Sequence, residues 1–152
     1  MPEGHTIHRA AREHRRVLAG QKLSVYSPQG RFSDGASLLD TQFCKTVEAF
    51  GKHLLYRFQN ELALHIHLGL FGRIRKQSLP LRDPRGAVRV RIACETHFID
   101  INGPTICEVL DRSGVDTLIN RIGPDVLRPD ANPEISFQKI KRSGLPIGRL
   151  IM

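Results

Sequence analysis

The stretch TVEAFGKHLLYRFQNELALHIH, residues 46–67, indicates the fold more clearly than any other part of the chain. Its β-type residues form three short segments, and turn signals such as Gln59-Asn60 separate them. Further segments of the same kind lie at 23–26, 87–92, 97–101 and 106–110. Many short antiparallel strands at this spacing are typical of a β-sandwich or a β-barrel.

Residues 4–19 are predicted to form an amphipathic helix before these strands. Apolar side chains recur there at spacings of three and four, from Ile7 to Leu18, and arginines occupy the remaining faces. Gly20 is a natural end for this helix. The first residues of the chain therefore lie at a helix N-terminus, where the partial positive charge favours a nearby anion and lowers the pKa of an amine.

The last quarter of the chain is predicted to be helical as well. Residues 116–122 form one short helix, and Asn132 followed by Pro133 is a capping residue with proline at the first helical position of another. A further helix begins at Pro146, with no cap, polar tail or turn behind it. We therefore expect residue 152 to interrupt a longer protein.

Three other segments carry weaker signals. The stretch 30–40 is rich in Gly, Ser and Asp, and the stretch 80–86 contains two prolines and a glycine, so both are predicted to be loops. Residues 87–92 alternate apolar and basic side chains, which is typical of a half-buried strand. We expect the outward face of that strand to be basic.

The composition favours a basic, globular protein. A chain of 152 residues is long enough for one domain with a core, and 40% apolar residues is ordinary for such a domain. Lys and Arg number 23 against 15 Asp and Glu, which gives a net charge of +8 and a pI near 10.0. That excess favours a polyanionic partner, most often nucleic acid, although a solvated basic surface is the alternative.

The chain shows no sign of a membrane or of an extracellular protein. No apolar run approaches the ~20 residues that span a bilayer, and the N-terminus has no signal-peptide core. The three cysteines are odd in number and widely separated, so they predict neither a zinc site nor a disulfide framework. We expect a cytoplasmic protein with no metal or cofactor in this chain.

The first residues could carry nucleophilic chemistry. Removal of Met1 would expose the secondary amine of Pro2, and an α-amino group has a reference pKa of about 8, well below the value of about 10.4 for lysine. Such an amine attacks carbonyl carbons, and proline then gives a charged iminium. The adjacent Glu3 is placed to move protons. The alternative is that Pro2 is an ordinary first residue and Glu3 caps the helix.

Two glycine-containing motifs are further candidates. Lys52, in Gly51-Lys52-His53, could meet a phosphate or donate a proton, or could be an ordinary surface lysine. In HIHLGLFG, residues 65–72, two glycines bracket Leu70 and Phe71, which suits a wedge driven into stacked bases. The alternative is a buried strand end. The two histidines of this motif point to one side of a strand, but no third metal ligand is evident nearby.

Four motifs in order resemble the formamidopyrimidine-DNA glycosylase / endonuclease VIII family of base-excision repair enzymes. They are PEGH at 2–5, GKHL at 51–54, HLGLFG at 67–72 and RIGPDVL at 121–127. The resemblance runs from residue 2 to 152. It implies an N-terminal β-sandwich flanked by helices, residues 1–124, followed by the truncated start of a helix-two-turn-helix DNA-binding domain, residues 125–152.

The resemblance also implies roles for individual residues. Pro2 corresponds to the nucleophile that attacks the sugar C1′, and Glu3 to the general acid/base beside it. Lys52 corresponds to the lysine that is implicated in contact with the DNA backbone and in β-elimination. The remaining DNA-binding positions are His67, Leu70, Phe71 and Arg121. The lesion base has to leave the stack, the gap has to be filled, and the phosphates need cations.

The chain departs from the family pattern in two places. Residues 102–107 replace the segment in which formamidopyrimidine glycosylases carry a gap-filling Arg and Phe, so the chain resembles the endonuclease VIII branch, which favours oxidised pyrimidines. The glycine-asparagine motif of the helical domain and the zinc finger are absent and would lie beyond Met152. The resemblance implies damaged double-stranded DNA as partner and a monomeric full-length protein near the nucleoid.

Three functional hypotheses therefore stand side by side. The first is a bifunctional DNA glycosylase with AP lyase activity, present as an N-terminal fragment. The second is the same fold acting only as a DNA-binding module. The third is an N-terminal-proline tautomerase, in which Pro2 would act as a base toward a small keto acid, but it leaves the basic charge and the later motifs unexplained.

Overall fold

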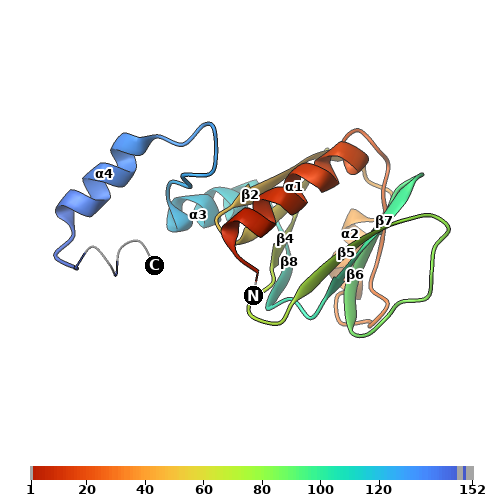
Figure 1. The fold of residues 1–152 in the computed structure, drawn as a ribbon. Helices are drawn as coiled ribbons and strands as arrows, with labels where there is room; N and C mark the ends of the chain where they lie inside the picture. Colours follow the sequence, from red (N-terminus) through yellow and green to blue (C-terminus); the bar gives the residue numbers. More distant parts are fainter. Residues whose placement is uncertain (1, 147–148, 150–152) are drawn as a thin grey trace.

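Two four-stranded antiparallel sheets form the centre of the computed structural model, which describes residues 2–146 and 149 (Figure 1). The first sheet has the strand order β1 (Ser24–Tyr26), β6 (Val88–Ala93), β7 (His97–Asn102), β5 (Arg73–Ser78). The second has the order β2 (Cys44–Phe50), β3 (His53–Phe58), β4 (Ala63–His67), β8 (Ile106–Leu110). The predicted β-sandwich with helices is confirmed.

The alternating pattern of residues 46–67 has a direct structural reason. On β3, Leu54 and Tyr56 point into the space between the sheets, where both are fully buried. Leu55 points to the opposite face and packs in a second apolar cluster. Tyr56 lies opposite Val47 of β2 and Leu64 of β4, so one register aligns the apolar side chains of three strands.

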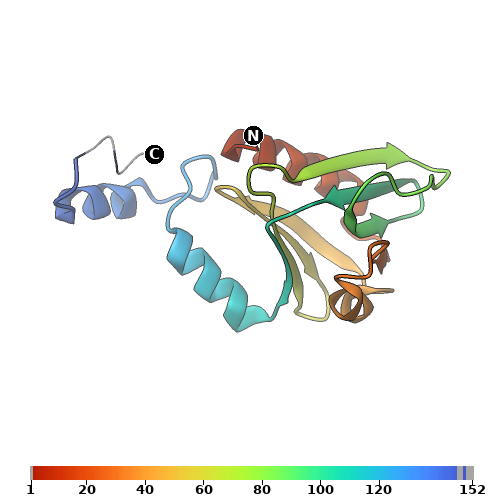
Figure 2. The ribbon, with the colours of Figure 1, turned by 90° about the horizontal axis from the view of Figure 1, so that it is seen from below.

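Two helices cover the second sheet from opposite sides (Figure 2). Helix α1 (Gly4–Leu18) packs on β2 and β3 and inserts Ile7 and Leu18 into the main core. Its one buried polar side chain, His14, lies 2.8 Å from the hydroxyl of Tyr56. Helix α3 (Arg112–Ile122) lies on the outer face, where its Val115 and Leu118 join the second cluster.

Helix α4 (Pro133–Arg142) stands apart from the sandwich (Figure 1). The predicted start is confirmed, because the Asn132 side chain accepts a hydrogen bond from the backbone N–H of Glu134 and Pro133 is the first helical residue. No residue of α4 is buried. The helix predicted from Pro146 falls largely on residues outside the described part of the chain.

Two predicted segments are wrong. The stretch 30–40 contains a helix, α2 (Ser33–Leu39), because burial of Ala36 and Leu39 in the core outweighs a composition that favours a loop. Helix α3 begins at Arg112 and not at 116, because the Asp111 carboxylate accepts a hydrogen bond from the backbone N–H of Gly114 and caps it there.

The first sheet differs from the prediction in two further respects. Strand β5 was not predicted, because it is an edge strand whose charged, largely exposed residues show almost no alternation of apolar and polar side chains. The outward face of β6 is not uniformly basic. Arg91 is 2% exposed, its guanidinium donates to both carboxylate oxygens of Asp100, and it also donates to the Arg82 carbonyl. Among the described residues, no helix is long and apolar enough to cross a membrane.

Candidate functional site

The side chain of Glu3 connects the first turn of α1 to the turn between β2 and β3. Glu3 is the capping residue of α1, and its carbonyl accepts from the backbone N–H of Thr6 and Ile7. Its carboxylate makes no capping hydrogen bond and instead lies 3.0 Å from the ammonium nitrogen of Lys52. The fold thus places a carboxylate and an ammonium group together beside Pro2.

Asp125 holds the Lys52 turn in place. One carboxylate oxygen of Asp125 accepts from the backbone N–H of Gly51 and lies against the ring nitrogen of His8, both at 2.6 Å. The other accepts from the backbone N–H of Leu127 at 2.9 Å. Burial acts to raise the pKa of Asp125, but these hydrogen bonds lower it more, so the pKa lies below its usual value. Sequence reasoning missed this role, although Asp125 is part of the RIGPDVL motif.

The turn between β4 and β5 presents two large apolar side chains to solvent. Leu70 is 60% exposed and Phe71 is 88% exposed. The turn is closed by a hydrogen bond from the backbone N–H of Gly72 to the carbonyl of Leu68. At Gly69, φ is +65° and a Cβ atom would lie 1.9 Å from the hydroxyl oxygen of Thr105, so only glycine fits. The alternative that Leu70 and Phe71 belong to the core is therefore wrong.

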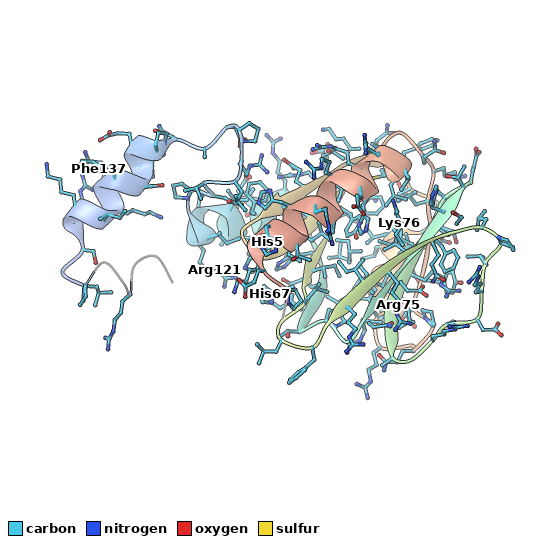
Figure 3. All side chains as sticks on the ribbon, viewed as in Figure 1. His5, His67, Arg75, Lys76, Arg121 and Phe137 are labelled. Carbon is cyan, nitrogen blue, oxygen red and sulfur yellow. The ribbon has the colours of Figure 1, made fainter. Side chains whose placement is uncertain are left out.

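Pro2 and this turn line a common cavity of about 560 Å³ between α1 and β5. Arg73 and Lys76 of β5 contribute positive charge to its wall, as does Arg9 of α1. Figure 3 shows Arg75 and Lys76 along β5, beside α1. A basic, partly apolar cavity is suited to an anionic ligand with a hydrophobic surface, and Pro2 lies on its wall.

Three histidines lie together on the outer face of the second sheet. The Nδ1 atom of His53 is 2.8 Å from Nε2 of His65, and Nδ1 of His65 is 2.8 Å from a carboxylate oxygen of Glu108. The rings of His53 and His67 are 4.7 Å apart. His53 is thus the third histidine that the sequence did not reveal. Within the described residues, no group of His, Cys, Asp or Glu has an arrangement that could hold a metal ion.

The remaining predicted site residues adjoin this cluster. Burial is the main cause that lowers the pKa of His67, and the positive charge of Lys52 also contributes. Arg121 of α3 acts in the same way on His53. In Figure 3, His67 and Arg121 lie close together near the first turn of α1. The structure therefore brings all seven predicted catalytic and DNA-binding residues to one region, and their roles stay predictions.

The structure is thus a β-sandwich opened by a helix, with its first residues on a basic cavity. The family model of the formamidopyrimidine-DNA glycosylase N-terminal domain matches residues 1–106. The chain belongs to this family. The predicted family is confirmed.

Curated relatives support the predicted branch. The chain is 44% identical over 156 residues to endonuclease 8 1 of Mycobacterium tuberculosis, and this match covers 100% of the chain and 58% of the relative. It is 31% identical over 145 residues to endonuclease 8 of an Escherichia coli strain, with 92% of the chain and 55% of the relative covered. The chain thus spans a little over half the length of these relatives.

Solved structures share the fold at low sequence identity. One is a complex of the Lactococcus lactis protein Fpg (MutM) with DNA containing N7-benzyl-Fapy-dG, with a TM-score of 0.78 and 18% identity over 99% of this chain and 60% of that chain. Another is MutM in complex with DNA containing carbocyclic 8-oxo-G, with a TM-score of 0.77, 18% identity and coverage of 61% of that chain. At this identity the likeness establishes the fold.

Proposed function

We propose that the chain is the catalytic part of a base-excision repair DNA glycosylase with AP lyase activity, which acts on oxidised bases, chiefly pyrimidines, in double-stranded DNA. The observation that carries the proposal is the pairing of Glu3 with Lys52 beside Pro2, at the edge of a basic cavity. The full-length protein would act as a monomer on nucleoid DNA in the cytoplasm. No cofactor is needed in this chain, because the amine of Pro2 supplies the nucleophile.

The proposed chemistry divides between three side chains. The nitrogen of Pro2 forms a bond to the sugar C1′ as the bond to the damaged base breaks, and opening of the sugar leaves an iminium ion. Glu3 moves protons at the sugar, since its carboxylate lies beside Pro2 in sequence and at the helix N-terminus. Lys52 binds the DNA backbone and assists β-elimination, in which a proton leaves C2′ and the 3′ phosphate departs.

The exposed turn and the positively charged side chains would stabilise DNA in which the damaged nucleotide is flipped out of the stack. A flipped nucleotide leaves a gap in the stack, and Leu70 and Phe71 are large, apolar and exposed enough to fill it. His67 and Arg121 lie on the same side and would contact phosphates. Since each neutralised phosphate releases counterions, binding should weaken steeply as the salt concentration rises, and Lys52→Ala should weaken binding and slow strand cleavage together.

Borohydride trapping tests this proposal. Wild-type protein should become covalently attached to DNA that contains an abasic site, because borohydride reduces the iminium to a stable amine. Pro2→Gly, or an N-terminal tag that blocks the amine, should abolish the adduct, whereas Pro84→Gly in an exposed loop should leave it unchanged. An adduct that survives blockage of the amine would remove Pro2 from the mechanism. Turnover of a small keto acid without DNA binding would favour the tautomerase.

Two observations favour a reduced activity for residues 1–152 alone. The chain covers 58% of its mycobacterial relative, and α4 buries no side chain. We expect little excision of a damaged base from duplex DNA, because base flipping needs contacts on both sides of the duplex, but slow reaction with an exposed abasic aldehyde. An assay beside endonuclease 8 1 of M. tuberculosis on both substrates measures this. Equal excision by the two proteins would contradict the expectation.

A further inference from the structure

The histidine cluster, defined as His53, His65 and His67, is joined to Glu108 by register as well as by hydrogen bonds. His65 on β4 lies directly opposite Glu108 on β8, and His53 on β3 lies directly opposite His67. All four side chains therefore project from one face of the sheet. Glu108 is 50% exposed, whereas His65 is fully buried. The row Glu108–His65–His53 therefore leads from solvent into the protein and ends beside the Lys52 turn.

The hydrogen bonds in this row have a fixed direction. An ionised carboxylate only accepts, so Nδ1 of His65 donates to Glu108. In neutral His65 the other nitrogen, Nε2, then carries a lone pair and accepts from Nδ1 of His53. Neutral His53 is left with an unprotonated Nε2. A proton added there would place its positive charge on a chain that ends in the carboxylate of Glu108.

His67 has the opposite tautomer and cannot take the proton as easily. Its Nδ1 accepts a hydrogen bond from the backbone N–H of Gly69 at 3.1 Å, so its proton lies on Nε2. A second proton on Nδ1 would break the hydrogen bond to the turn that carries Leu70 and Phe71. Neutral His67 therefore remains a donor through Nε2, and His53 is the available acceptor in the cluster.

Burial, together with nearby charges, opposes protonation of His53 and His67 in the free protein. Burial lowers the pKa of His53 to about 4, and His65, His67 and Arg121 add to this effect. Lys52 faces His67 from the β2–β3 turn, while Glu3 pairs with Lys52 and Glu108 faces His65. Neutralisation of Arg121 by a bound anion would remove a positive charge that opposes protonation of His53, and neutralisation of Lys52 would remove one that opposes protonation of the adjacent His67.

We propose that binding of a nucleic-acid phosphate at Lys52 and Arg121 is coupled to uptake of one proton at Nε2 of His53, with Glu108 compensating the charge through His65. This coupling rests on the proposed function, because it needs DNA to bind at this face. The coupling makes His53 a positioning residue and not a catalytic one. Protonated His53 adds a positive charge next to the His67 ring only when the phosphate is bound. The uptake stops at one proton, because the neighbouring imidazole rings would repel a second charge.

Calorimetry with a duplex that contains a tetrahydrofuran abasic-site analogue tests the coupling. This analogue has no aldehyde, so Pro2 cannot form an iminium and binding is separated from chemistry. Titrations in two buffers with different ionisation enthalpies, between pH 5.5 and 7.5, count the protons taken up. We expect uptake that approaches one proton per complex as the pH falls, with affinity rising by up to about tenfold per pH unit.

Four variants separate the proposal from its alternatives. His53→Gln should abolish the uptake, and Glu108→Gln, at a half-exposed position, should shift the uptake to lower pH. His67→Gln should weaken binding but retain the uptake, and His97→Gln on β7 is the matched control with no change. Binding without proton uptake, or uptake that persists in His53→Gln, overturns the coupling and leaves the proposed function standing. Absence of any binding overturns both.

Discussion

The sandwich and the segment 125–146 are built on different principles. The sandwich has a core in which side chains such as Leu54 and Ile99 are fully buried, and it is closed on one face by α3. In the segment 125–146, by contrast, Phe137 is 56% exposed and stands clear of the sandwich (Figure 3). Helix α4 therefore forms from its local cap and proline, whereas the sandwich is held by packing at long range.

The two regions are joined by polar contacts and not by a shared core. Besides Asp125, the joint contains Arg128, whose guanidinium donates to the Ala49 carbonyl and to Glu48, both at 3.2 Å, and lies 3.9 Å from the Phe50 ring centroid. Such directional contacts fix an orientation while they bury little apolar area. The comparison thus predicts large effects of mutations within the sandwich, intermediate effects at the joint and small effects in α4.

The largest effect is expected from Asp100→Ala in the sandwich. The substitution leaves the guanidinium of Arg91 buried without its carboxylate, which costs about 3–5 kcal/mol in comparable cases. Urea unfolding followed by circular dichroism measures the loss. Asp130→Ala is the matched control in the other region, since it removes an exposed carboxylate from Arg128, and its midpoint should equal that of wild type. Equal effects of the two substitutions would contradict the comparison.

Acid should destabilise the sandwich through His14. Burial, and to a smaller extent the charge of Lys76, lowers the pKa of His14 from 6.5 to about 4. Between these two pKa values the unfolded chain binds more protons than the folded one, so the free energy of unfolding falls as the pH falls. The loss begins near pH 6.5 and reaches about 3 kcal/mol at about pH 4. Urea unfolding at several pH values measures it.

The variant His14→Gln should reduce the slope of stability against pH in that window. His97→Gln, which replaces a partly exposed histidine on β7, should leave the slope as it is in wild type. The segment 125–146 contains no histidine, so the slope reports on the sandwich. An unchanged slope in His14→Gln would show that His14 is not the group that titrates.

The joint should show an intermediate effect in Asp125→Ala. The substitution leaves the part-buried backbone N–H of Gly51 and the exposed one of Leu127 without their acceptor, at a cost of about 1–2 kcal/mol. Limited proteolysis should also cut near residues 123–132 faster, because the linker loses its attachment to the Lys52 turn. Asp125→Asn, which retains one acceptor oxygen, should fall between Asp125→Ala and wild type. If all three proteins unfold and are cut alike, Asp125 does not hold the joint.

The same contrast explains how much of the fold the sequence could predict. Local patterns predicted α1, the start of α4 and most strands, because alternation and helical spacing reflect which face is buried. Helix α2 was missed because Ala36 and Leu39 are buried by distant strands, and β5 was missed because an edge strand with one half-buried apolar residue, Ile74, shows almost no alternation. Arg91 was placed outward because its partner, Asp100, lies on another strand.

The candidate site shows the same limit. Pro2, Glu3 and Lys52 were proposed from motifs, but the contact of Glu3 with Lys52 depends on how α1 packs on β2, which no local spacing encodes. The sequence predicted only part of the histidine cluster. Alternation placed His65 and His67 on one face of a strand, whereas His53 joins them only through the register of β3 with β4. Contacts that depend on strand register are fixed by the whole sheet.

The smallest effect is expected from Ile135→Ala in α4, and its matched control is Leu118→Ala in α3. Leu118 is 4% exposed and packs on the sheet, so its truncation should cost about 2–5 kcal/mol. Ile135 is 48% exposed, and alanine is the better helix former, so Ile135→Ala should change stability by less than about 0.5 kcal/mol and in the favourable direction. Urea unfolding of both variants at several protein concentrations gives the comparison. A loss in Ile135→Ala that grows with protein concentration would mean that α4 is covered by a second copy of the chain, and the contrast between the two regions would then hold only for the monomer.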